Sequence, residues 1–167
     1  AMRALGVRLI EHGDDFTEAS DHAAQLAEAR GALRVPSFHA DLVSGVATYW
    51  WEFLKAVPQL DVAYVPIGLG SIAAKLALGH KARIVGVVSR HATTYADSLA
   101  AGRVVEAPVT TQIADGMAVR RADAAALAAM TGRLDHVVQV SDDEVAGAMR
   151  ALYADTHNAA EGAGAAA

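Results

Sequence analysis

Three short runs of β-branched and apolar residues, separated by segments with helical periodicity, constrain the fold of this chain most strongly. The runs cover residues 61–67, 83–89 and 136–140. Continuous apolar runs of this length are typical of strands that are buried on both faces of a parallel sheet. Because such strands alternate with helices here, the sequence predicts an α/β fold, a parallel sheet with helices on both faces.

Helical spacing and helix-end signals set the expected helices around these strands. Their predicted ranges are 16–30, 41–57, 72–78, 94–101, 122–130 and 142 to about 156. The last one begins with a capping box, in which Ser141 is the N-cap and Glu144 stands three residues later. A further strand is expected over residues 7–11, where apolar side chains recur at every second position.

The composition excludes several classes of protein. The chain has no cysteine, which rules out disulfides, thiolate zinc sites and a cysteine nucleophile. Its net charge of −5 argues against a nucleic-acid or anionic-membrane surface, and Arg120-Arg121 is the only adjacent basic pair. No apolar run approaches the roughly 20 residues of a membrane span. We therefore expect a globular protein of the cytoplasm that binds neither nucleic acid nor membrane.

A glycine loop follows the first buried run at once, in the order Ile67-Gly68-Leu69-Gly70-Ser71. Such a loop lets backbone N–H groups turn inward at a helix N-terminus, and together these features can hold a phosphate. An ordinary tight turn between a strand and a helix would show the same pattern. The loop is neither a P-loop nor a dinucleotide fingerprint, because the lysine and the third glycine are missing.

A second candidate is Glu161, which lies among small residues in Asn158-Ala159-Ala160-Glu161-Gly162-Ala163-Gly164. It is either a carboxylate that starts a helix or a carboxylate beside a flat ligand. The acidic run at residues 142–144 is expected to complement a helix dipole. The histidines are expected not to cluster, and no metal site is predicted. Of the adjacent Trp50 and Trp51, one is expected to pack and the other to face a partner or a domain seam.

The order of the motifs is more specific than any one of them. The series is 36–49, 65–71, 84–89, 113–118, 140–145 and 158–164. It resembles the threonine/serine dehydratases of the tryptophan-synthase-β-like, fold type II pyridoxal-phosphate enzymes over nearly the whole chain. The resemblance implies pyridoxal 5'-phosphate as cofactor and an L-threonine or L-serine substrate, deaminated to a 2-oxo acid and ammonia. It also implies a homodimer.

The resemblance assigns roles to residues of this chain. Gly68, Leu69, Gly70 and Ser71 match the loop that holds the cofactor phosphate, and Glu161 matches an acidic residue near the cofactor ring. Residues 1–37 resemble part of the small mobile domain, and residues 38–167 resemble part of the large cofactor-binding domain.

The chain departs from the family at the catalytic lysine. Lys55, Lys75 and Lys81 are its only lysines, and none matches the family's Schiff-base lysine. The Ser-Gly-Asn-His-type loop is also missing. We therefore expect an incomplete part of a longer enzyme, inactive alone. The alternatives are a serine racemase or diaminopropionate-type lyase, a non-catalytic phosphate- or nucleotide-binding module, or a structural partner subunit anchored by Trp50 or Trp51.

Overall fold

The computed structural model describes residues 2–68 and 79–167. The chain divides into two compact units, Ala1–Val35 and Pro36–Ala167. The assignment of residues 1–37 to a small mobile domain and of 38–167 to a large domain stays a prediction. The predicted helix at 72–78 lies outside the described residues.

The first unit is built on one helix. A 3-10 turn, Met2–Leu5, precedes α1, Phe16–Arg30, whose predicted range is confirmed. The carboxylate of Asp15 caps α1 by accepting the N–H of Glu18 at 2.8 Å, and Gly31 ends it in the left-handed conformation with φ 59°. The strand predicted over residues 7–11 is wrong. That segment pairs with no other among the described residues of this unit, and a strand exists only within a ladder.

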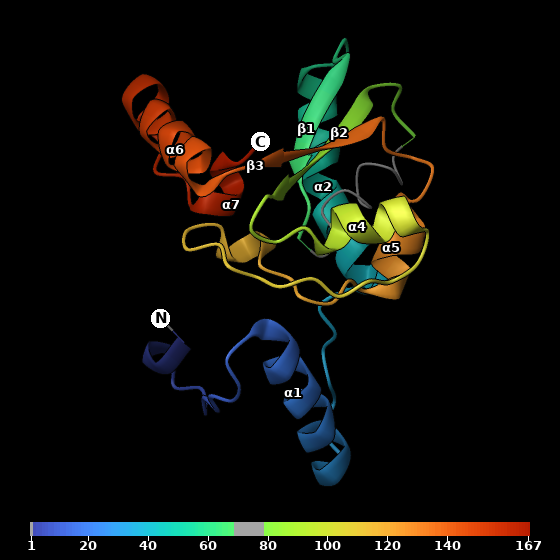
Figure 1. The fold of residues 1–167 in the computed structure, drawn as a ribbon, viewed down its shortest axis with the longest axis vertical. Coiled ribbons are helices and arrows are strands. Elements are labelled where there is room, and N and C mark those ends of the chain that lie inside the picture. The colour runs from blue at the N-terminus through green and yellow to red at the C-terminus, as the bar shows by residue number, and fades with distance from the viewer. Residues whose placement is uncertain (1, 69–78) are drawn as a thin grey trace. The chain divides into compact units, whose positions relative to one another are not determined.

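The second unit holds a three-stranded parallel sheet in the order β1-β2-β3 (Figure 1). The strands are β1, Val62–Pro66, β2, Arg83–Ser89, and β3, His136–Val140. The described helices are α2, Ala40–Ala56, α4, Thr94–Ala101, α5, Ala124–Met130, α6, Asp142–Thr156, and α7, Gly162–Ala165, together with the 3-10 turn η2, Asp115–Met117. The sequence predicted each of these elements to within two residues, except η2 and α7.

Helices cover both faces of the sheet, as the apolar pattern predicts. On one face Val65, Ile84 and Val88 pack with Trp50 of α2 and Met130 of α5. On the other face a second cluster joins β2 and β3 to η2, α6 and α7. Its buried members are Val87, Ala114, Met117, Val145, Ala163 and Ala166. The predicted fold class is confirmed, and each face contributes its own apolar core.

Burial differs among the strands. Every residue of β2 after Arg83 is buried, as expected for a central strand. In β1 and β3 the side chains of Tyr64, His136 and Gln139 are exposed, so the prediction of burial on both faces is wrong for these two. Both are outer strands of the described sheet, where neighbours on one side are missing.

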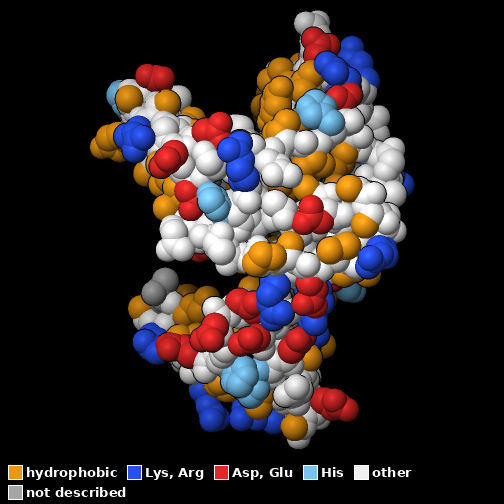
Figure 2. All heavy atoms as spheres, in the orientation of Figure 1, with side chains coloured by type: hydrophobic (Ala, Val, Ile, Leu, Met, Phe, Trp, Pro, Cys, Tyr) orange, Lys and Arg blue, Asp and Glu red, His pale blue; other side chains and the backbone are white. Residues whose placement is uncertain are grey.

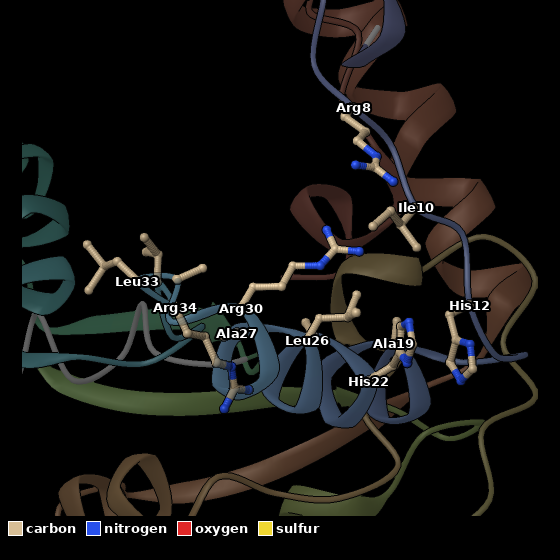
Figure 3. Close-up of a pocket in the computed structure, with 13 residues that line it drawn as sticks. Arg8, Ile10, His12, Ala19, His22, Leu26, Ala27, Arg30, Leu33 and Arg34 are labelled. Atoms are coloured by element: carbon tan, nitrogen blue, oxygen red, sulfur yellow. The ribbon is translucent and has the colours of Figure 1, made fainter.

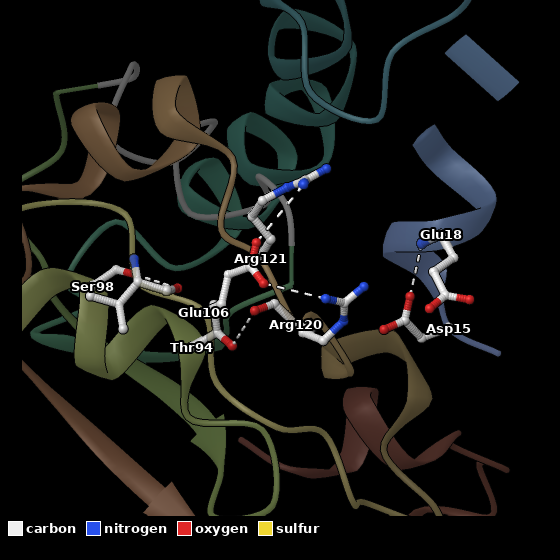
Figure 4. Close-up of polar contacts among 8 residues, drawn as sticks. Asp15, Glu18, Thr94, Ser98, Glu106, Arg120 and Arg121 are labelled. Carbon is white, nitrogen blue, oxygen red and sulfur yellow. Dashed lines mark hydrogen bonds and ion pairs between the residues drawn. The ribbon is translucent and has the colours of Figure 1, made fainter. Parts of the chain in front are cut away.

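Hydrogen bonds fix the long irregular segment between α4 and α5 (Figure 4). The hydroxyl of Ser98 in α4 accepts the N–H of Val105 at 3.0 Å, and Thr94 donates to the carbonyl of Arg120 at 3.1 Å. Glu106 pairs with Arg120 at 3.3 Å and with Arg121 at 3.9 Å. Both arginines of the adjacent basic pair therefore share the single carboxylate of Glu106. The segment between Val105 and Arg120, which contains η2, is therefore held at both of its ends.

One of the two tryptophans of α2 packs in the core, as expected. Trp50 is only 5% exposed, whereas Trp51 is 57% exposed. Apolar side chains also remain visible on the surface of both units (Figure 2). No helix in the described part of the chain is long and apolar enough to span a membrane.

Candidate cofactor site

The carboxyl ends of the three parallel strands meet at one edge of the sheet. Ligands of such sheets bind outside this edge. Gly68 lies here, two residues beyond the end of β1. It is the first residue of the predicted phosphate loop. The other three, Leu69, Gly70 and Ser71, lie outside the described residues.

Gly68 approaches the backbone of η2 very closely. A Cβ atom on Gly68 would lie 2.5 Å from the carbonyl oxygen of Gly116. Side chains essentially never pack at such a distance, and the obstacle is backbone rather than a flexible side chain. Glycine at position 68 is therefore what allows the end of β1 to rest on η2.

Gly116 in turn contacts the start of α7. A Cβ on Gly116 would lie 2.8 Å from the Cβ of Ala163 and 3.8 Å from a carboxylate oxygen of Glu161. Gly162 is still closer to the same segment, since its Cβ would lie 1.8 Å from the carbonyl oxygen of Ile113. Segments that are far apart in sequence thus converge at this edge through glycines.

Glu161 caps the short helix α7. One carboxylate oxygen accepts the N–H of Ala163 at 2.8 Å, and the other accepts the N–H of Gly164 at 2.6 Å. The helix-start interpretation is therefore correct. Glu161 remains exposed, and each carboxylate oxygen has a second lone pair for a ligand. The structure places Gly68 and Glu161 on two sides of Gly116, whereas the role of either in cofactor binding stays a prediction.

Asp142, the first residue of α6, anchors the loop that carries Gly116. Its carboxylate accepts the hydroxyl of Thr111 at 2.7 Å and the backbone N–H of Gln112 at 2.7 Å. The hydroxyl of Thr111 also accepts the N–H of Ala114 at 3.1 Å. The hydrogen bond from Gln112, followed by that from Thr111, holds the pKa of Asp142 below its ordinary value.

The neighbouring acid Glu144 has a different partner. It completes the capping box by accepting the N–H and the hydroxyl of Ser141, which lower the pKa of Glu144. The predicted capping box is confirmed. The sequence offered only the helix-dipole interpretation for Asp142, and it missed the contact of Asp142 with a loop 30 residues earlier. A hydroxyl and a carboxylate that lie so far apart in the sequence form no recognisable local motif, so their contact could not be predicted.

The residues at this edge fit a flat phosphorylated cofactor. Gly68 presents no side chain at the end of β1, and backbone N–H groups are the usual ligands of phosphate. The exposed carboxylate of Glu161 stands beside Gly116 and provides a polar flank. A ring bound here would meet small residues and one acid.

Neither described lysine lies at this edge. Lys81 precedes β2 at its amino end, roughly 20 Å from the carboxyl end of a strand of seven residues. Lys55 lies in the last turn of α2, shortly before β1 begins, with its ammonium 5.1 Å from the ring centroid of Trp51. Lys75 lies outside the described residues. Within 2–68 and 79–167, no amine is placed to react at the carboxyl edge.

The first unit contains a separate hollow of about 400 Å³ against α1 (Figure 3). Arg8 and Arg30 extend toward the same space beside Ile10. His12 and His22 stack with ring centroids 3.8 Å apart. The expectation that the histidines do not cluster is therefore wrong for this pair. None of the predicted site residues lines the hollow. Among the described residues, no three metal-ligating side chains gather.

Comparison with known proteins gives the family. The sequence model of the family described as "Pyridoxal-phosphate dependent enzyme" matches residues 1–167. An "L-threonine ammonia-lyase" of Geobacter sulfurreducens is 36% identical over 171 aligned residues, which cover 99% of this chain and 42% of that protein.

Solved structures give the same fold. The processed form of threonine deaminase isoform 2 from Solanum lycopersicum superposes with a TM-score of 0.87 at 28% identity, over 99% of this chain and 50% of that one. Maize serine racemase superposes with a TM-score of 0.85 at 26% identity, over 98% and 51%. The chain thus spans about half the length of these relatives or less.

Proposed function

Because the chain belongs to the family of pyridoxal-phosphate-dependent enzymes, we propose that it forms the phosphate-binding and ring-flanking part of a pyridoxal-phosphate site. The reaction proposed for the enzyme is deamination of L-threonine or L-serine to a 2-oxo acid and ammonia. The observation that carries the proposal is the convergence of Gly68 and Glu161 on Gly116 at the carboxyl edge of the sheet. The named similarity to threonine ammonia-lyases supports the choice of reaction.

The cofactor, when bound, accepts the electrons released when a bond at Cα of the amino acid breaks. The residues of this chain would bind and orient it. Gly68 and the following Leu69, Gly70 and Ser71 would hold the phosphate. Glu161, fixed by the N–H groups of Ala163 and Gly164, would flank the ring. The resemblance implies a Schiff-base lysine at this edge, and neither Lys55 nor Lys81 is placed to serve as one.

Serine racemase is the second candidate within the family, since the maize enzyme has nearly the same fold over this chain. A non-catalytic phosphate-binding module is the candidate from another class, and the position of Lys55 and Lys81 favours it. The homodimer, the cytoplasmic location and the two-domain assignment belong to the same proposal.

Absorbance of the purified 167-residue chain, titrated with pyridoxal phosphate before and after borohydride, tests the proposal. We expect saturable binding that inorganic phosphate displaces and that borohydride does not make covalent at Lys55 or Lys81. A spectrum that does not change on titration would contradict the cofactor site. A stoichiometric covalent adduct on Lys55 or Lys81 would contradict the placement of these two amines away from the carboxyl edge.

Glu161→Gln is the matched variant for the ring-flanking role. The amide oxygen retains one of the two bonds to α7, whereas the negative charge is lost. We expect the band position of the bound cofactor to shift, with the affinity for inorganic phosphate unchanged. Equal spectra for the two proteins would remove Glu161 from the site.

A further inference from the structure

We infer that Asp142 is a positioning residue for the cofactor edge, acting through residues 111–116 on Gly68 and Glu161. The inference rests on the proposed function. Asp142 itself touches none of the predicted cofactor residues in the described structure. Its role is to fix a segment that both of them contact.

The first link is the pair of hydrogen bonds from the loop to Asp142. Thr111 and Gln112 donate to different oxygens of the same carboxylate, each at 2.7 Å. Hydrogen bonds to a charged acceptor are shorter and stronger than neutral ones. The loop is therefore tied at two adjacent residues to the first turn of α6, whose own start is fixed by the capping box of Ser141 and Glu144.

The second link runs along the loop. The hydroxyl of Thr111 accepts the N–H of Ala114 at 3.1 Å, and the carbonyl of Ala114 accepts the N–H of Met117 at 2.9 Å. Ala114 and Met117 are buried in the core between η2, α6 and α7. Gly116 lies between these fixed residues, so its carbonyl position follows from the anchor at Thr111.

The third link is close packing at Gly116. Gly68 meets the carbonyl of Gly116, backbone against backbone, and Gly116 also faces the Cβ of Ala163 and the carboxylate of Glu161. The contacts with Gly68 and with the Cβ of Ala163 transmit a displacement because no rotamer change can absorb it. A shift of the loop would therefore displace the end of β1 or the start of α7.

The adjacent acid provides a matched control. Asp143 is exposed in the same helical turn, and the loop donates to Asp142 rather than to Asp143. Both residues interact alike with the helix dipole. Asp142→Ala and Asp143→Ala therefore remove the same charge, and only the first removes the anchor of the loop.

The test is the dissociation constant of the 167-residue chain for pyridoxal phosphate, measured well below the melting temperature. We expect Asp142→Ala to weaken binding about tenfold, the equivalent of about 1.4 kcal/mol, and Asp143→Ala to stay within about twofold of the wild type. At saturating cofactor, the induced circular dichroism should change for Asp142→Ala alone, because it reports the orientation of the ring. A residue that only stabilises the fold would lower the melting temperature without altering that signal.

Thr111 gives the second pair of variants, which leave α6 untouched. Thr111→Val removes the donor to Asp142 and should weaken binding as Asp142→Ala does, whereas Thr111→Ser keeps the hydroxyl and should bind as the wild type. Wild-type binding with no difference between the Asp142 and Asp143 variants would overturn the positioning role and leave the proposed function intact. A wild-type chain that does not bind the cofactor would overturn both.

Discussion

Gly162→Ala places a methyl group where the structure has no room. Its Cβ would lie 1.8 Å from the carbonyl oxygen of Ile113, 2.6 Å from the carbonyl carbon and 3.2 Å from the Cα of Ala114. All three atoms are backbone, so α7 and the loop must separate by more than 1 Å to reach the 3.0 Å that real contacts respect. Overpacking of a core typically costs 1–3 kcal/mol, and a backbone obstacle puts this case near the upper end, about 3 kcal/mol.

The free energy of unfolding from urea denaturation measures that cost. Gly147→Ala, in the interior of α6, is the matched control, because nothing lies within 4 Å of its new Cβ. It should stabilise the chain by about 0.5–1 kcal/mol through helix propensity. A Gly162→Ala variant that unfolds at the same urea concentration as the control would refute the close approach of α7 to Ile113. It would also remove the basis for the convergence at the carboxyl edge.

Three further results are expected. Trp50→Ala should destabilise the chain by about 3–5 kcal/mol because Trp50 is buried in the core. Trp51→Ala should change the free energy of unfolding by less than about 0.5 kcal/mol, because Trp51 is exposed. Equal losses for the two variants in urea denaturation would contradict the orientation of α2. Ser141→Ala should cost about 1 kcal/mol by removing the capping box of α6, read from thermal unfolding, and no loss would contradict the cap. Burial raises the pKa of Tyr95 from 10.0 to about 12. The unfolded chain therefore loses this proton at a lower pH than the folded chain does. The contribution of Tyr95 to the free energy of unfolding is complete below pH 10, and roughly 2–3 kcal/mol of it is lost as the pH rises to 12. Tyr95→Phe should flatten that part of the stability–pH curve, and an unchanged slope would refute the assignment.

Elements that local signals determine were predictable from the sequence. The range of α1 follows from its helix-end signals, and in the structure Asp15 caps its start and Gly31 ends it. The central strand β2 follows from an unbroken apolar run. Each of these signals lies within a few residues of the helix or strand that it specifies. The element can therefore be predicted without knowing its tertiary contacts.

Features that depend on distant partners were not predictable. Alternation over residues 7–11 predicted a strand, yet no ladder forms there among the described residues. The exposure of Tyr64 and His136 follows from the order of strands in the sheet, which a local pattern does not encode. The same holds for the bond between Thr111 and Asp142, 31 residues apart. At the candidate site the motifs indicated Gly68 and Glu161, whereas only the tertiary fold shows that Gly116 lies between them.

The direction of the strands puts the proposed cofactor-binding residues and the described lysines at opposite ends of the sheet. Parallel strands bring their carboxyl ends to one edge, where Gly68 follows β1, and the described lysines, Lys55 and Lys81, belong to the opposite end of β1 and β2. Even a fully extended lysine side chain reaches only about 6 Å from its Cα. The strand β2 is roughly 20 Å long, so neither amine can reach from its amino end to its carboxyl end. Peptide mapping after borohydride should therefore find only substoichiometric, non-saturable labelling of Lys55 and Lys81. A single saturable adduct on Lys55 or Lys81 would instead show that the cofactor binds at the amino edge, and it would overturn the site built on Gly68, Gly116 and Glu161.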